Sequence, residues 1–299
     1  MICTVSVLIP VYNRRESLIR AITSVVNQTR RPDEIIVVDD GSDFEVGVYL
    51  RQKYPQLADQ VMVIRQEVNG GVSKTRNIAF QKSTGHLIAL LDSDDEWHPE
   101  KLAKQVVLFE DNLQIDLVTC QQWIVQNEKR RREKRELYRE NLFDHLIYGW
   151  HPPTPSSLMM KRRFLEEIPF DESIRYLEDL DWWLKFSLLE PTIEYVDEFL
   201  MYYHTSELNR LSYANFQERF IKINQVLSRW KPTLIHKKGI DKYRVFKNHL
   251  LTFNAIDAFV VCIRKRRLAL AVRIVMKYLW NKKEFYQLGG KRILKWINE

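Results

Sequence analysis

Three carboxylates follow an apolar run in the segment Ile88–Asp95, which is Ile-Ala-Leu-Leu-Asp-Ser-Asp-Asp. The four apolar residues show no helical period and predict a buried strand of a parallel sheet. Asp92, Asp94 and Asp95 then lie at the carboxyl end of that strand, where open α/β sheets bind ligands. Acids this close repel one another, and a divalent cation relieves the repulsion while keeping positions open for phosphate oxygens. The segment therefore predicts a metal-assisted enzyme that acts on a phosphate-containing substrate.

Two further acidic clusters occur at comparable places along the chain. Asp39 and Asp40 follow the apolar run 34–38, so parallel pairing would bring them to the same edge of the sheet. The third cluster begins a predicted helix and consists of Glu178, Asp179 and Asp181. Acids at a helix N-terminus also complement the helix dipole, and that structural role is the simpler explanation for the third cluster alone. Together with the other two clusters, it is better interpreted as functional.

Alternating strand and helix patterns must position these acids. Apolar runs predict strands at residues 5–9, 34–38, 61–64 and 88–91, and helical stripes predict helices at 16–27, 46–54 and 73–82. This alternation predicts an α/β fold with a doubly wound, mostly parallel, Rossmann-like sheet flanked by helices. Further strands are predicted at 116–125 and 193–203, and further helices at 100–111, at 177–189 and from Phe216 onward. The basic run 129–135 predicts an exposed hairpin tip or loop, without an assigned function.

Composition restricts the class of protein. The 299 residues are 45% hydrophobic and 28% charged, a balance typical of a globular protein with a substantial core. The three cysteines have no metal-ligand spacing and indicate free thiols in a reducing compartment rather than a disulfide framework. The chain starts without a signal-peptide pattern, and its apolar stretches are shorter than the ~18 residues that span a bilayer. We therefore expect a cytoplasmic protein without a transmembrane helix.

The charge is unevenly distributed along the chain. Residues 206–299 carry 21 Lys and Arg against 6 Asp and Glu, a net charge of +15, whereas residues 1–205 have a net charge of −8. Residues 263–283 combine an apolar helical face with many basic residues, and Trp280 and Trp296 are typical of membrane interfaces. This pattern favours peripheral attachment to an anionic membrane, at the inner face of the cell membrane. The alternative is a helix that packs on the catalytic domain or on a partner subunit; basic charge without a recognised motif does not indicate a nucleic-acid partner.

Six segments of the sequence resemble family 2 of the inverting glycosyltransferases, which have the GT-A fold. They occur in the family's order and spacing, at residues 5–13, 28–29, 34–42, 69–77, 85–95 and 178–179. The resemblance covers roughly residues 4–205. It implies a GT-A catalytic domain at residues 1–205, followed by a basic helical C-terminal region at 206–299.

The resemblance also implies roles for individual residues. The implied nucleotide-binding residues are Pro10, Tyr12, Asn13, Asp40, Arg76, Asp92 and Ser93. Tyr12 would lie beside the base, Asp40 would accept a hydrogen bond from it, and Arg76 would hold the ribose or phosphate end. Asp92 and Asp94 would be the acids of the Asp-x-Asp motif, with Asp92 at the ribose and Asp94 as the main ligand of Mn²⁺ or Mg²⁺.

The remaining implied roles concern the acceptor. Asp179 would be the catalytic base, because an acceptor hydroxyl is a poor nucleophile until a carboxylate takes its proton. Residues 154–157 occupy the place of an acceptor-side loop in the family. His204 is either a metal or phosphate contact, as in some relatives, or a structural histidine, and Asp95 has no assigned role.

Three functions remain to be distinguished. The favoured one is a hexosyl- or N-acetylhexosaminyltransferase. It would move a sugar from a nucleotide sugar, expected to be a UDP-sugar, to a saccharide or lipid-linked acceptor in cell-surface polysaccharide or lipopolysaccharide synthesis. A sugar-phosphate nucleotidyltransferase would usually have a glycine-rich loop after the first strand, where this chain has Pro10-Val-Tyr-Asn13. A non-catalytic nucleotide-sugar-binding protein would not need all the acids that are present.

Overall fold

The computed structural model describes residues 3–134, 142–147, 152–205, 216–264 and 274. The chain divides into two compact units. The first comprises Met1–Leu142 and Pro152–Asn209, and the second comprises Phe143–His151 and Arg210–Glu299. Assignment of residues 1–205 as the catalytic domain and 206–299 as a separate functional region stays a prediction.

The first unit begins with four parallel strands, as the alternating pattern predicts. They are β1 (Val5–Val11), β2 (Glu34–Asp39), β3 (Met62–Arg65) and β4 (Leu87–Leu90). Their order in the sheet is β3-β2-β1-β4, so the chain first builds outward from β1 and then returns to its other side. The strand order therefore reverses between β1 and β4, and open α/β sheets bind ligands beyond the carboxyl ends of strands at such a point.

The other half of the sheet is mixed. Strand β8 (Met159–Lys161) runs antiparallel to β4, and β6 (Leu117–Gln126), β9 (Ile193–His204) and β5 (Glu96–Trp97) follow it in the sheet. Strand β7 (Lys129–Glu133) forms a hairpin with β6. The predicted hairpin tip or loop at 129–135 is thus corrected, because residues 129–133 pair with β6 as a strand.

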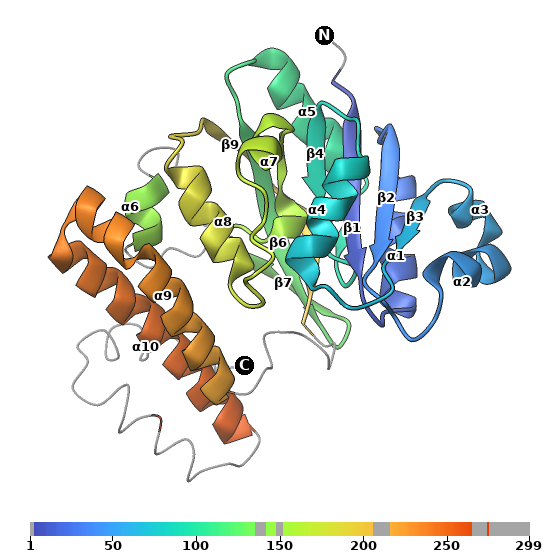
Figure 1. Ribbon diagram of the computed structural model, residues 1–299. Helices are drawn as coiled ribbons and strands as arrows, with labels where there is room; N and C mark the ends of the chain where they lie inside the picture. Colours follow the sequence, from blue (N-terminus) through green and yellow to red (C-terminus); the bar gives the residue numbers. More distant parts are fainter. Residues whose placement is uncertain (1–2, 135–141, 148–151, 206–215, 265–273, 275–299) are drawn as a thin grey trace. The chain divides into compact units, whose positions relative to one another are not determined.

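Helices cover both faces of the sheet. On one face lie α1 (Glu16–Val26), α2 (Val46–Lys53) and α5 (Lys101–Asp111), whose apolar residues join the main core cluster. Helix α4 (Val72–Lys82) packs over β1 and β2 on the opposite face (Figure 1). The other helical elements of this unit are α3 (Pro55–Ala58), the 3₁₀ turn η1 (Pro155–Ser157), α7 (Arg163–Glu167) and α8 (Glu178–Ser187).

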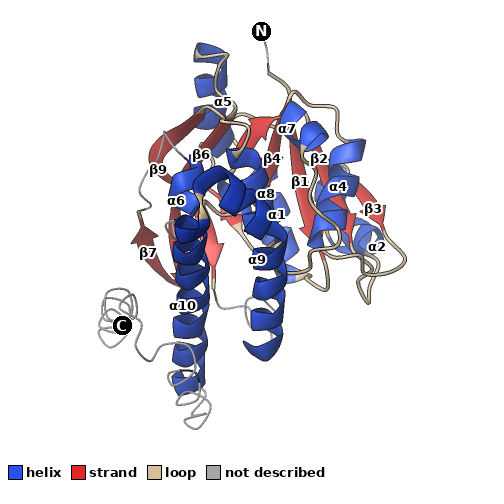
Figure 2. Ribbon diagram, turned by 60° about the vertical axis from the view of Figure 1, so that its left-hand side comes forward, coloured by secondary structure: helices blue, strands red, loops and turns tan. Residues whose placement is uncertain are grey.

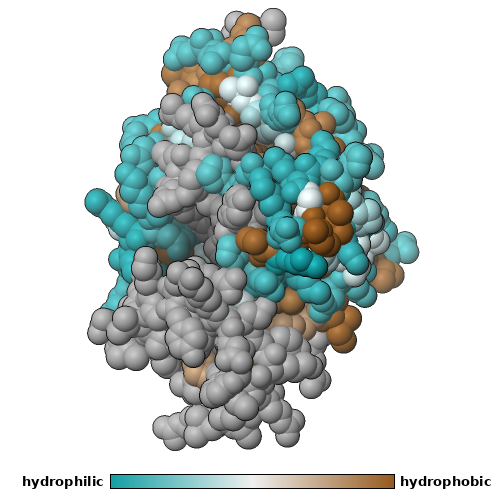
Figure 3. Space-filling view, turned by 90° about the vertical axis from the view of Figure 1, so that its left-hand side faces the viewer, coloured by the Kyte–Doolittle hydropathy of each residue, from teal (hydrophilic) through white to brown (hydrophobic). Residues whose placement is uncertain are grey.

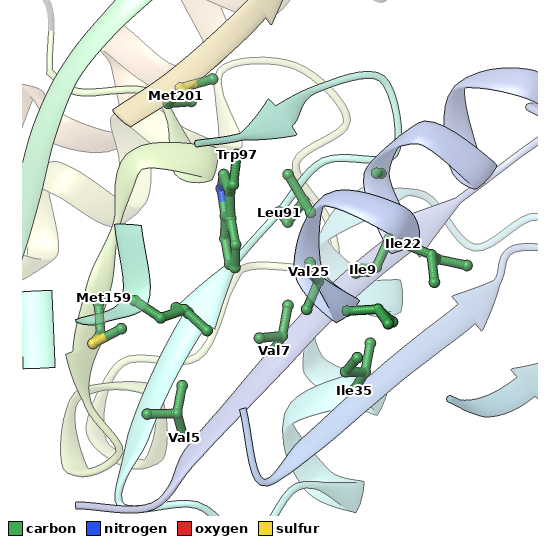
Figure 4. Packing of buried hydrophobic residues seen from close by; sticks show 14 of the residues in the cluster. Val5, Val7, Ile9, Ile22, Val25, Ile35, Leu91, Trp97, Met159 and Met201 are labelled. Atoms are coloured by element: carbon green, nitrogen blue, oxygen red, sulfur yellow. The ribbon is translucent and has the colours of Figure 1, made fainter. Parts of the chain in front are cut away.

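The core forms because alternate residues of each strand point to the same face. Val7 and Ile9 of β1 lie beside Ile22 and Val25 of α1, and all four are fully buried (Figure 4). Every residue of β1 is buried, as expected for a central strand covered on both faces. On the face that Figure 3 shows, the coloured surface is mostly hydrophilic, and hydrophobic atoms form small separate groups.

The second unit is helical in its described part. It contains α6 (Leu142–Ile147), α9 (Phe216–Lys238) and α10 (Ile240–Arg264), and α9 and α10 lie side by side (Figure 2). Lys238 Nζ lies 2.9 Å from Asp144 Oδ1, which ties α9 to α6. Among the described helices, we find none with the length and apolar character needed to cross a bilayer. The predicted amphipathic segment 263–283 lies mostly outside the described residues.

Candidate functional site

The predicted acids meet beyond the carboxyl ends of β1, β2 and β4, together with the start of α8. Arg76 connects two of these places, because its guanidinium contacts Asp92 after β4 and Glu178 at the start of α8. The loops after β1 and β2 are joined by Asn13, whose backbone N–H donates to Ser42 Oγ at 2.9 Å. The structure thus gathers residues from four separate motifs at one edge of the sheet.

Asp92–Asp95 form a tight turn, in which Asp95 N–H donates to the Asp92 carbonyl at 3.0 Å. Ser156 of η1 forms hydrogen bonds with the first and last residues of this turn. Its hydroxyl accepts from Asp92 N–H at 3.0 Å and donates to Asp95 Oδ2 at 2.7 Å. Asp95 is 1% exposed, so its carboxylate has a structural role in anchoring the turn. The Asp92 side chain is 29% exposed and remains accessible to a ligand.

Arg76 lies in the interior of the site, with a side chain that is 3% exposed. Its Nη2 is 2.7 Å from Asp92 Oδ1, its Nη1 is 3.4 Å from Glu178 Oε1, and the ring of Phe170 packs against the guanidinium. Burial alone would lower the pKa of Arg76, but the charges of Asp92 and Glu178 outweigh it and raise this pKa. Arg76 therefore fixes the spacing between the Asp-x-Asp turn and α8; its predicted contact with the donor stays a prediction.

Glu178 and Asp179 are two acids at the N-terminus of α8 that share this interior. Burial, followed by the charge of Asp179, raises the pKa of Glu178 to about 7. Burial also raises the pKa of Asp179, although Leu180 N–H donates to its Oδ1 at 2.8 Å and acts in the opposite direction. Groups whose pKa is moved toward neutrality are suited to proton transfer near pH 7. The raised pKa values therefore suit this pair of acids to a role in proton transfer.

Asp181 does not join this pair. It is 1% exposed, and its Oδ2 lies 2.8 Å from Nζ of Lys185 one turn further along α8. The third acidic cluster therefore divides into two acids at the site and one acid that pairs within its helix.

Asp40 directly follows β2, as predicted, and its carboxylate accepts hydrogen bonds from residues of the loop after β3. Oδ1 accepts from Gln66 Nε2 at 2.8 Å and from Gly70 N–H at 2.7 Å, and Oδ2 accepts from Gly71 N–H at 2.9 Å. Gly71 has φ +87°, and this positive φ favours glycine in the turn. A carboxylate has about four acceptor positions, so one remains for a base N–H. The contact with the base stays a prediction.

Three predicted nucleotide-binding residues, in the last part of β1 and just after it, differ in their surroundings. Pro10 is a buried residue within β1, opposite Val38 of β2. Asn13 has φ +51°, and its side chain exchanges two hydrogen bonds with Asp43, of 2.8 and 3.0 Å. Tyr12 is 46% exposed and presents its ring to solvent at the site edge. Of these three, Tyr12 is the residue most open to a nucleotide, and the roles of all three stay predictions.

Asp94 faces basic groups of the loop and helix that follow β1. Its Oδ2 is 3.3 Å from Arg14 Nη2, and its carbonyl accepts from Arg20 Nη2 at 3.0 Å. Ser93, between the two acids, is 6% exposed. Arg14 and Arg20 thus balance part of the negative charge of the turn.

The predicted Mn²⁺ or Mg²⁺ can be tested against this donor set. In the described part of the chain, no three His, Cys, Asp or Glu side chains form a ready-made ligand group. Mg²⁺ at phosphate sites is usually held by one or two carboxylates together with substrate phosphates. Asp92 and Asp94 fit that arrangement, in which the diphosphate supplies the other ligands. The cation itself stays a prediction.

His204, at the end of β9, lies beside this edge. Its backbone N–H donates to Asp95 Oδ1 at 3.3 Å, and its Nε2 is 3.3 Å from Glu96 Oε2. The hydrogen bond from His204 is the largest influence on Glu96 and lowers the pKa of that carboxyl. These contacts connect β9 to the turn, and both predicted roles of His204 stay predictions.

Sequence reasoning missed four residues that shape the site. Arg14, Arg20 and Gln66 lie outside the acidic clusters, and nothing in their local pattern marks them. Ser156 belongs to the predicted acceptor-side loop 154–157, but its contact with the Asp92–Asp95 turn depends on the antiparallel strand β8 that follows it. The Pro155 that starts η1 was the available signal for a fixed loop here.

Comparison with known proteins places this geometry in a family. The family model described as glycosyl transferase family 2 matches residues 6–169. An uncharacterised glycosyltransferase of Methanocaldococcus jannaschii is 25% identical over 83% of this chain and 87% of its own length. The Bacillus subtilis protein TuaG, a glycosyltransferase named for teichuronic acid biosynthesis, is 37% identical over 34% of this chain and 40% of its own length.

Solved structures show the same fold. Residues 1–349 of Staphylococcus aureus TarS, in complex with UDP-GlcNAc, match 92% of this chain and 80% of that chain with a TM-score of 0.67 and 20% identity. In a second TarS structure, this chain covers 43% of the solved chain, with a TM-score of 0.60. The family model matches more than half of this chain, and the solved structures have the same architecture. The chain therefore belongs to glycosyl transferase family 2 and has the GT-A fold.

Proposed function

We propose that the protein is an inverting glycosyltransferase that uses a UDP-sugar and transfers a hexosyl or N-acetylhexosaminyl group to a hydroxyl of a saccharide or lipid-linked acceptor. The observation that carries the proposal is the buried connection from Asp92 through Arg76 to Glu178 and Asp179. Arg76 contacts Asp92 through Nη2 and Glu178 through Nη1, which supports a donor-side role for Asp92 and a proton-accepting role for the pair of acids at the start of α8. The complexes of TarS with UDP and UDP-GlcNAc support the choice of donor, and the name of TuaG supports a role in cell-surface polysaccharide synthesis.

In this proposal the donor lies over the carboxyl ends of β1, β2 and β4. The exposed ring of Tyr12 packs beside the base, the remaining acceptor position of Asp40 receives the base N–H, and Asp92 contacts the ribose. Asp94, with Asp92, would hold Mn²⁺ or Mg²⁺ at the diphosphate. When bound, the cation would stabilise the negative charge that develops on the leaving nucleoside diphosphate.

Asp179 takes the proton from the acceptor hydroxyl as that oxygen attacks the sugar. A positioned carboxylate typically contributes ~10²–10⁴-fold to such a step, and it acts best when its pKa is near the working pH. Burial raises the pKa of Asp179 in that direction. Arg76 keeps the pair of acids at a fixed distance from Asp92, so that base and donor are aligned. Attack from the face opposite the leaving group inverts the configuration of the sugar.

A thermal-shift screen of nucleotide sugars, with and without Mn²⁺, tests the proposal. A UDP-sugar should raise the melting temperature more with Mn²⁺ than without it, because a ligand that binds only the folded state stabilises it. The variant Asp94→Asn should lose the Mn²⁺-dependent part of the shift. The variant Asp111→Asn, in which an exposed acid at the end of α5 is changed, should keep it. If no nucleotide sugar shifts the melting temperature, or if the protein releases pyrophosphate from a nucleoside triphosphate and a sugar phosphate, the proposal is wrong.

The net charge of +15 on residues 206–299 supports a separate proposal, peripheral attachment to an anionic membrane. Sedimentation with anionic liposomes should decrease with salt and should be lost when residues 263–299 are deleted. Equal binding by the shortened protein would rule out this segment as the anchor, and a change of oligomeric state on deletion would instead indicate a subunit contact.

A further inference from the structure

An arginine-rich surface on the β6–β7 hairpin has no part in the donor site. Strand β7 presents four consecutive basic residues, Lys129–Arg132, and all four are exposed. We call Arg130 and Arg132, together with the rings of Trp123, Phe199 and Tyr202 beneath them, the arginine face. The three rings are only partly buried, so the arginine face combines charge with accessible aromatic surface.

The aromatic rings hold the two guanidinium groups in place. Arg130 Cζ lies 4.7 Å from the centre of the Tyr202 ring, and Arg132 Cζ lies 5.2 Å from the centres of both the Trp123 and Phe199 rings. A guanidinium held against a ring keeps its N–H groups available at the edge of its plane. Such a planar fork matches a carboxylate or a phosphate and loses less entropy on binding than a mobile side chain.

These two arginines are not neutralised by acids of the described chain. Asp197 of β9 forms an ion pair with Lys134, in which Lys134 Nζ lies 3.0 Å from Asp197 Oδ2. Within residues 3–134 and the other described segments, Arg130 and Arg132 make no ion pair. The hydrogen bond with His204 is the main cause of the lowered pKa of Glu96, and the charge of Arg130 adds a smaller contribution. The arginine face therefore offers positive charge to an anionic partner.

The pairing of the strands places the arginine face beside the site edge. Arg130 is opposite Val125 of β6, and Val125 is opposite His204 of β9. His204 donates its backbone N–H to Asp95, the last acid of the turn that begins at Asp92. Neighbouring residues across paired strands lie on the same side of a sheet. The strand pairing thus places Arg130 at the end of the sheet where His204 contacts the Asp92–Asp95 turn.

We propose that the arginine face binds the acceptor, and that this acceptor is an anionic glycan with repeated carboxylate or phosphate groups. The inference rests on the proposed function and specifies the substrate class of the same site. Guanidinium forks bind the anionic groups, and the accessible aromatic rings pack against the sugar units between them. The position beside the reaction edge favours a substrate over a membrane surface, because a bound chain would extend from Arg132 past Arg130 toward the donor.

Binding of short glycans to the full chain tests the proposal. The probes are a trimer of galacturonic acid, a short poly(glycerol phosphate), a neutral isomaltose trimer, and vesicles of phosphatidylglycerol and phosphatidylcholine. The double variant Arg130→Gln/Arg132→Gln should weaken binding of an anionic glycan about tenfold, because two charge-assisted contacts are lost. The matched control Arg51→Gln/Lys53→Gln removes the same charge from exposed positions of α2 and should change the affinity less than about twofold. The variant Arg130→Lys/Arg132→Lys should bind with intermediate affinity, because it keeps the charge and loses the planar forks.

Hydrogen exchange locates the bound glycan and separates this surface from the basic C-terminal region. Protection of residues 123–133 and 199–204 by either anionic probe supports the proposal, and the stronger of the two probes identifies the anionic group. Protection confined to residues 206–299, equal binding of the neutral trimer, or binding of vesicles alone would overturn it. If the protein binds a UDP-sugar and the arginine variants bind glycans like the control, only this inference fails. If no nucleotide sugar binds, the proposed function fails.

Discussion

Ser156 provides a sharp test of how the Asp92–Asp95 turn is held, because its neighbour Ser157 is a natural control. Both side chains are at most 1% exposed, and both hydroxyl groups make two hydrogen bonds. Ser156 contacts Asp92 and Asp95, whereas Ser157 contacts Thr119 Oγ1 and the carbonyl of the preceding loop. Replacement of each serine by alanine removes the same atoms from the same turn and leaves a similar small space.

The expected losses follow from the partners. Ser156→Ala removes a bond to a buried carboxylate, typically ~1.5–3 kcal/mol, and one to a backbone N–H, about 1 kcal/mol, so the free energy of unfolding should fall by about 3 kcal/mol. Ser157→Ala removes two bonds between neutral groups and should cost about 2 kcal/mol. Only Ser156→Ala loosens the turn. If about 1 kcal/mol is then needed to reorder the turn when the diphosphate binds, UDP affinity falls roughly fivefold.

Urea unfolding and calorimetric titration of UDP in the presence of Mn²⁺ measure the two effects separately. The reasoning predicts that both variants unfold at lower urea, and that only Ser156→Ala binds UDP more weakly. Ser156→Thr, which keeps the hydroxyl, should recover much of the affinity. Equal UDP affinity of the two alanine variants would refute the role assigned to Ser156.

Two further predictions concern the buried network. Arg76→Met should lower the free energy of unfolding by about 3–5 kcal/mol, because it leaves Glu178 and Asp92 without their buried partner; a loss below about 1 kcal/mol in urea unfolding would contradict this. The pKa of Glu178 is about 7 in the folded protein and 4.5 as its ordinary value, so its contribution to stability is complete below pH 4.5 and is lost as the pH rises through 7. Between pH 4.5 and 7, the unfolding free energy of the unmodified protein should therefore fall by roughly 3 kcal/mol more than that of Glu178→Gln. Parallel curves of unfolding free energy against pH for the two proteins would show that Glu178 does not hold its proton.

The parallel half of the fold is predictable from local sequence. Residues 5–9, 34–38 and 88–91 are apolar runs that end in polar residues, and a strand covered on both faces requires little more than that. Their carboxyl ends meet because parallel strands share a direction, which is why the convergence of Asp40 and Asp92 could be expected. The antiparallel strand β8 was not predicted from local pattern, because its direction is set by pairing with β4 and β6.

The strand at residues 129–133 and the side-chain partners at the site depend on contacts between distant parts of the chain. Residues 129–133 are almost all basic and lack strand propensity, yet pairing with residues 122–126 and packing of arginines on aromatic rings make them a strand. Arg76 looks like a ligand contact in sequence, and its burial between two acids depends on where α8 begins. The sequence assigns no role to Asp95, because its anchoring role depends on Ser156 from a distant loop. Local patterns predict strand ends, whereas side-chain partners come from tertiary structure.

The most direct test of the central claim compares transfer and donor binding in Asp179→Asn. With the UDP-sugar found in the screen, the variant should bind the donor as the unmodified protein does, because Asp179 is assigned to the acceptor proton and makes no proposed donor contact. Its rate of sugar transfer under saturating donor should fall at least ~100-fold, the smaller end of the contribution of a positioned base. Transfer at the unmodified rate, with donor affinity unchanged, would contradict the assignment of Asp179 as the base and with it the proposed mechanism.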